Sequence, residues 1–101
     1  MKQATKTDMT SFHGETFRAS ALDLEKILGV PVYAMNDGTD KVNFEWEMET
    51  SEGEVFTVYD WKEYRSISKS EPIEWHIGSR TPSTSVTALN EIADALNRLD
   101  Q

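Results

Sequence analysis

Residues 42–48 alternate strictly between apolar and polar side chains, and this alternation restricts the fold more than any other feature of the chain. The apolar set is Val42, Phe44, Trp46 and Met48, and the residues between them are Asn43, Glu45 and Glu47. A period of two is typical of a β-strand with one face on a core. Ser51–Glu54 then gives a hairpin turn signal, and Val55–Trp61 returns as the partner strand. Because both faces of the second strand are partly apolar, we expect it to lie centrally in the sheet.

The other elements follow from helical spacing, capping residues and shorter apolar runs. They are a strand at Ser11–Ala19, a helix at Ser20–Leu28 that ends at Gly29, a strand at Ile73–Ile77 and a helix at Val86–Leu99. Ser20 can cap the first helix, and one residue of Ser83–Ser85 can cap the second. The predicted fold is α+β, a small antiparallel sheet of about four strands packed by two helices.

The chain length fits one domain, since 101 residues can bury a single core. The polar segment Met1–Thr10 is expected to form a disordered or loosely attached leader. The single α+β domain then spans residues 11–101. The leader lacks the apolar middle of a signal peptide, and no apolar run approaches the ~18 residues that a membrane span needs.

Composition excludes several kinds of chemistry. The absence of cysteine rules out disulfides, thiolate metal sites and a thiol nucleophile. A net charge of −8 argues against a general binder of phosphate backbones, because that affinity comes from clustered Lys and Arg. His13 and His76 have no metal-ligand spacing, and no nucleophile elbow is present. We therefore expect a binding protein without metal or cofactor, and not an enzyme.

Two segments gather aromatic and charged residues where predicted strands end. They contribute the candidate ligand-binding residues Tyr59, Asp60, Trp61, Lys62, Trp75, His76, Gly78 and Arg80. Aromatic faces can stack on a nucleobase, and Lys62 or Arg80 can meet a phosphate. A nucleotide-like molecule is therefore the ligand that these groups fit. The plainer alternative is that both tryptophans belong to the core and that Gly78 only ends a strand.

Five acidic residues fall on the predicted hairpin. They are Glu45, Glu47, Glu49, Glu52 and Glu54. A row of carboxylates on a rigid ribbon can imitate a phosphate backbone and occupy the basic groove of a nucleic-acid-binding protein. The alternative is an outer sheet face that is simply solvated, because solvent-facing strand positions are usually polar.

The order of these motifs resembles a group of small accessory proteins of tailed bacteriophages. The resemblance rests on Tyr59-Asp60-Trp61-Lys62 followed by Trp75-His76-Ile77-Gly78, and it covers about Phe17 to Leu96. Ser79 stands where a second glycine often follows in that group. The resemblance implies a protein that antagonises host defence in the host cytoplasm.

Three functions agree with this context. The leading expectation is a non-catalytic protein that sequesters a nucleotide-like immune signal, as a homo-oligomer if a second subunit completes the site. The alternatives are an acidic inhibitor that blocks a host defence protein such as a nuclease, and a structural or regulatory phage protein with protein contacts only.

Overall fold

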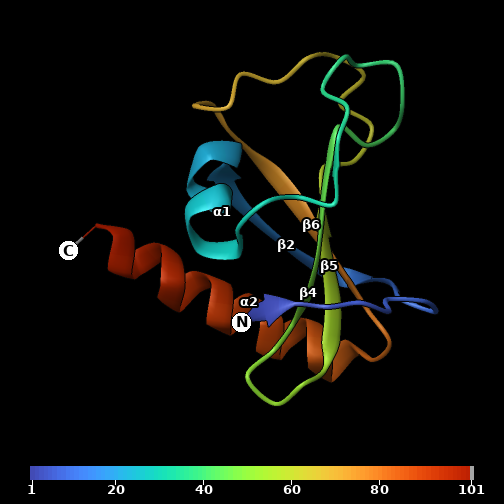
Figure 1. Ribbon diagram of the computed structural model, residues 1–101, viewed down its shortest axis with the longest axis vertical. Coiled ribbons are helices and arrows are strands. Elements are labelled where there is room, and N and C mark those ends of the chain that lie inside the picture. The colour runs from blue at the N-terminus through green and yellow to red at the C-terminus, as the bar shows by residue number, and fades with distance from the viewer. Residues whose placement is uncertain (101) are drawn as a thin grey trace.

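A computed structural model describes residues 1–100 as one antiparallel sheet and two helices (Figure 1). The elements are β1 (Lys2–Gln3), β2 (Ser11–Ser20), α1 (Ala21–Leu28), β3 (Tyr33–Ala34), β4 (Phe44–Glu49), β5 (Val55–Tyr59), β6 (Pro72–Ser79) and α2 (Pro82–Leu99). The strand order is β1-β4-β5-β6-β2, and β3 also pairs with β4. The α+β class, the antiparallel sheet, the two helices and the central position of β5 are confirmed.

The sheet has six strands instead of the predicted four or so. The two additional strands, β1 and β3, are only two residues long and pair with opposite ends of β4. Strands this short carry no periodic signal, so their pairing depends on contacts between distant parts of the chain.

The core lies between the sheet and the helices, which both lie on the same face of the sheet (Figure 1). Trp46 and Trp75 are fully buried and meet edge to face, with ring centroids 5.5 Å apart. Each indole N–H is satisfied, because Trp46 donates to Gly29 O at 2.8 Å and Trp75 donates to Ala19 O at 2.8 Å. Both rings therefore fill the core without leaving a buried donor unpaired.

Capping residues set where both helices begin. The backbone N–H of Asp23 donates to Ser20 Oγ at 3.1 Å, which confirms Ser20 as the cap of α1. The predicted cap of α2 within Ser83–Ser85 is wrong. Thr81 caps α2 instead, and Pro82 is its first residue. Proline suits this position because its fixed φ matches the helix and its missing N–H would have no partner there.

The first ten residues differ from the expected loose leader. Lys2 and Gln3 pair with Glu49 and Met48 of β4, and Ala4 continues the attachment through its N–H to Glu47 O at 3.0 Å. At the other end of the segment, the Arg80 side chain donates to Asp8 O at 3.1 Å. The leader is thus held to the sheet at two points.

Candidate functional site

The sheet face opposite the helices carries four aromatic rings in a row, here called the aromatic strip: Phe12, His76, Tyr59 and Trp61. Centroid separations along the strip are 4.4 Å for Phe12–His76, 5.7 Å for His76–Tyr59 and 6.1 Å for Tyr59–Trp61. Strand register builds the middle of the strip, because Tyr59 of β5 lies opposite His76 of β6. The two end rings, Phe12 and Trp61, keep 44% and 42% of their surface exposed, so the strip is open to a partner.

The side chain of Thr57 leaves no room for a side chain at Gly78. A Cβ at this position would come within 2.6 Å of Thr57 Oγ1 and 3.5 Å of a Tyr59 ring carbon. The side chains of β5 therefore occupy the space that a larger residue would take on β6. This packing accounts for a glycine in a central strand without a phosphate loop.

Trp61 separates two hollows on this face. The first, of about 360 Å³, lies between the leader and Tyr59. The second, of about 330 Å³ and here called the Tyr33 hollow, is lined by Tyr33, Asp40, Lys41, Val42, Glu45 and Trp61. The ammonium groups of Lys41 and Lys62 lie 5.8 and 5.6 Å from the Trp61 ring centroid. The indole thus already attracts cations to its π-face.

Burial and nearby acidic residues raise the pKa of three side chains near Trp61. Burial raises the pKa of the Glu45 carboxyl above its usual value, and the neighbouring Glu47 charge raises it further. Burial and then the Glu45 charge raise the pKa of Tyr59. Burial followed by the charges of Asp40, Asp37 and Asp60 raises the pKa of Tyr33. In all three cases burial is the larger cause, and the acidic neighbours add to it.

The predicted pairing of Trp61 with Trp75 around one hollow is wrong, because the two indoles lie on opposite faces of the sheet. Trp75 is fully buried against the helices, whereas Trp61 contacts Tyr59 on the open face. Tyr59, His76 and Trp61 do come together, with Lys62 beside them. The structure places the remaining predicted residues, Asp60 and Arg80, in other roles.

Asp60 is a fully buried carboxylate that holds two loops. Its oxygens accept from Asn43 N at 2.8 Å, Phe44 N at 2.9 Å and Asn43 Nδ2 at 2.9 Å. Asn43 Nδ2 also donates to Arg65 O at 3.0 Å. The carboxylate therefore joins the start of β4 to the end of β5, while Arg80 holds the leader through Asp8.

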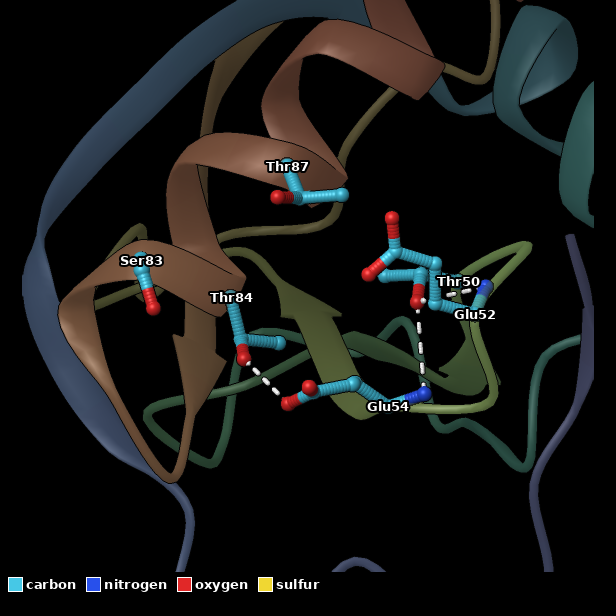
Figure 2. Close-up of a pocket in the computed structure, with 6 residues that line it drawn as sticks. All are labelled: Thr50, Glu52, Glu54, Ser83, Thr84 and Thr87. Atoms are coloured by element: carbon cyan, nitrogen blue, oxygen red, sulfur yellow. Dashed lines mark hydrogen bonds between the residues drawn. The ribbon is translucent and has the colours of Figure 1, made fainter.

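The five acidic residues of the predicted row divide into two groups. Glu45, Glu47 and Glu49 lie half-buried along the open face of β4. Glu54 instead points toward α2, where Thr84 Oγ1 donates to its carboxylate at 2.6 Å (Figure 2). Glu52 and Glu54 line a separate hollow of about 260 Å³ with Thr50, Ser83, Thr84 and Thr87 (Figure 2). A single continuous row of five carboxylates is therefore wrong. Glu45 lies next to the aromatic strip, opposite Tyr59, whereas Glu47 and Glu49 lie opposite Thr57 and Val55.

Sequence reasoning assigned no role to Tyr33, Asp40 or Lys41 because they fall in a connector without periodicity. Pairing of β3 with β4 brings Tyr33 opposite Glu45. The Asn36-Asp37-Gly38 turn indicated only that the chain turns between Tyr33 and the next strand, and no local pattern indicated the pairing itself.

Within residues 1–100, no three His, Cys, Asp or Glu side chains are grouped so that they could hold a metal ion. Over the same residues, neither helix is both long and apolar enough to span a membrane. Comparison with protein-family models, curated proteins and solved structures finds no match to the chain.

Proposed function

We propose that the protein is a non-catalytic inhibitor that binds a basic partner protein on the open face of its sheet. The observation that carries the proposal is a row of three half-buried carboxylates on the open face of β4, the first of which, Glu45, lies beside Tyr59 and Trp61. Glu45, Glu47 and Glu49 of β4 take part in none of the ion pairs formed among residues 1–100. A cationic partner would offset the unfavourable burial of the Glu45 charge and its repulsion with Glu47.

The two kinds of side chain serve different parts of binding. Aromatic residues contribute much of the binding energy in protein interfaces, since they bury large rigid surfaces. Trp61 and Phe12 offer such surfaces at the two ends of the aromatic strip. The net charge of −8 would accelerate association with a basic protein by electrostatic steering.

The resemblance to phage accessory proteins supports a host defence protein as the partner, met in the host cytoplasm. A nuclease is the class that we favour. Cationic side chains line its substrate groove, and three spaced carboxylates can bind them in place of phosphates. In this proposal the inhibitor competes with nucleic acid and performs no chemistry.

A charge-reversal pull-down tests the proposal. The tagged protein is incubated with bacterial lysate, and captured proteins are identified with and without competing duplex DNA. We expect basic nucleic-acid-binding proteins that DNA displaces, and we expect Glu45→Lys/Glu47→Lys to lose them. The matched control is Asp94→Lys on α2 with Asp100→Lys at its C-cap, which makes the same change in net charge away from the open face. The proposal is contradicted if Glu45→Lys/Glu47→Lys still captures the same proteins, or if DNA does not displace them.

A second candidate function is the sequestration of a nucleotide-like molecule, and the observation that favours it is the pair of lysines near Trp61. A base stacked on Trp61 would leave a phosphate within reach of Lys41 and Lys62. Calorimetry against cyclic and linear nucleotides, with Lys62→Gln as the weakened variant, tests this function. The absence of heat and an unchanged melting temperature with every nucleotide would eliminate it.

A further inference from the structure

The Tyr33 hollow combines two aromatic rings with two carboxylates in one small space. Tyr33 and Trp61 supply the rings, and Asp40 and Glu45 supply the carboxylates. We propose that this hollow is a socket for one arginine side chain of the partner protein. The inference rests on the proposed function and names the chemical group that the partner inserts.

Backbone pairing positions three of the four walls. Tyr33 lies opposite Glu45 in the β3–β4 register, so both side chains project on the same side of the sheet. Val32 N donates to Glu45 O at 2.8 Å and extends this pairing by one residue. Lys62 N donates to Lys41 O at 2.7 Å, which fixes the loop carrying Trp61 to the loop before β4.

Arginine matches this lining better than other cations do. A guanidinium is planar and weakly hydrated, so it can stack on an indole or phenol ring while donating two parallel hydrogen bonds to a carboxylate. The ammonium of lysine is a compact, strongly hydrated charge that gains less from aromatic walls. A phosphate would have to approach Asp40 and Glu45 directly, at a Coulombic cost.

Lys41 distinguishes an arginine ligand from a nucleotide ligand in this hollow. Its ammonium lies 5.8 Å from the Trp61 ring centroid and lines the same hollow. An incoming arginine must displace this ammonium from the ring, whereas a nucleotide phosphate would gain from it. Removal of the Lys41 charge therefore has opposite effects on the two ligands.

The test follows the Trp61 indole N–H of the full chain by ¹H–¹⁵N NMR while N-acetyl-arginine amide is added. N-acetyl-citrulline amide is the neutral probe of the same shape, and adenosine monophosphate is the anionic probe. We expect a saturable shift with the arginine probe, about tenfold weaker binding in Glu45→Gln, as for loss of one charge-assisted pair, and tighter binding in Lys41→Met. The control variant, Asp94→Asn, removes an acidic charge from α2 and should bind as wild type does.

Several results would overturn the socket. They are equal shifts with arginine and citrulline probes, no saturable shift with arginine, or weaker arginine binding in Lys41→Met. A saturable shift with adenosine monophosphate that Lys41→Met abolishes also overturns it and supports the second candidate function. If Trp61 does not respond to arginine while Glu45→Lys/Glu47→Lys still loses partner capture, the socket is wrong and the proposed function stands. If Glu45→Lys/Glu47→Lys still captures the partner while arginine binds at Trp61 of the wild type, the proposed function is wrong and the socket stands.

Discussion

Thr84 Oγ1 donates a 2.6 Å hydrogen bond to Glu54 Oε2 and so joins the β4–β5 hairpin to the first turn of α2. The first turn of α2 contains no acidic residue of its own. Glu54 therefore supplies from the hairpin the negative charge that favours a helix N-terminus. This contact explains why one acidic residue of the hairpin serves stability while Glu45, Glu47 and Glu49 remain on the open face.

Removal of this contact should destabilise the fold measurably. We expect Thr84→Val to lower the free energy of unfolding by about 1 kcal/mol, because the isosteric side chain cannot donate to Glu54. Urea denaturation followed by circular dichroism gives the value. Ser83→Ala, which also removes a hydroxyl from the first turn, should change it by less than about 0.5 kcal/mol. An unchanged midpoint for Thr84→Val would show that the bond contributes nothing to α2.

Asp60 should matter more for stability than any exposed acidic residue. Asp60→Ala leaves the backbone N–H groups of Asn43 and Phe44 and the Asn43 amide without their acceptor. Because three buried donors lose their acceptor together, we expect a loss of about 3 kcal/mol or more in the free energy of unfolding. The measurement is equilibrium unfolding in urea.

The matched control for Asp60 is Asp40→Ala, an exposed aspartate in the same pair of loops. Its carboxylate accepts from Lys41 N at 2.7 Å at the surface, where water can replace it. We expect a change below about 0.5 kcal/mol for this variant. Equal losses for the two variants would contradict the structural role assigned to Asp60.

The two candidate tryptophans should respond in opposite ways to the same substitution. Trp75→Phe leaves a cavity in the core and deprives Ala19 O of its donor, so we expect a loss of about 2 kcal/mol. Trp61→Phe removes part of an exposed ring and should cost less than about 0.5 kcal/mol. Emission spectra provide a second check, because the neutral quencher acrylamide should reach Trp61 more readily than Trp75. Comparable quenching of both indoles would contradict the assignment of opposite faces.

The sequence predicted the fold well where periodicity was local. The alternation through Phe44, Trp46 and Met48 identified the buried face of β4, and Ser20 with Gly29 identified both ends of α1. The start of α2 was predicted four residues late. The side chains of its first turn are mostly small and polar, so the apolar helical pattern begins only at Val86. Thr81-Pro82 nevertheless carried a valid capping signal.

The candidate site was predicted only in part, because face assignment at the end of a strand depends on tertiary contacts. Trp61 was predicted as the last residue of the strand Val55–Trp61, and Trp75 as the middle residue of the strand Ile73–Ile77, both with polar neighbours. Register across the sheet decides that Trp75 faces the helices and that Tyr59 and His76 face outward. Tyr33 joins the site through a pairing with β4 that no local pattern encodes.

Gly78→Ala should be destabilising, although alanine usually suits a folded backbone better than glycine does. The added Cβ would lie 2.6 Å from Thr57 Oγ1, and both residues are buried in neighbouring central strands. We expect a loss of about 1 to 3 kcal/mol from overpacking. In a Thr57→Ala background the same change should be neutral or stabilising, since the clashing oxygen is gone. A double-mutant cycle in urea measures the coupling, and additive effects would disprove the clash.

Glu45→Gln should stabilise the protein at neutral pH and have little effect in acid. Burial and the Glu47 charge raise the pKa of Glu45 in the folded state, so the folded protein binds this proton more tightly than the unfolded chain does. Stability is therefore lost as the pH rises from the ordinary carboxyl pKa through the raised folded value, and the penalty is complete above it. Glutamine keeps the shape of the side chain and removes the penalty.

The measurement for Glu45 is the difference in melting temperature between variant and wild type at about pH 7 and about pH 3.5. We expect a higher melting temperature for Glu45→Gln at the upper pH and a difference near zero at the lower pH, where both states of the wild type are protonated at this residue. Glu49→Gln controls for the removal of one charge from the same face of β4. If Glu45→Gln lowered the melting temperature at neutral pH, the carboxylate would be stabilised by its surroundings. That result would contradict the raised pKa of Glu45.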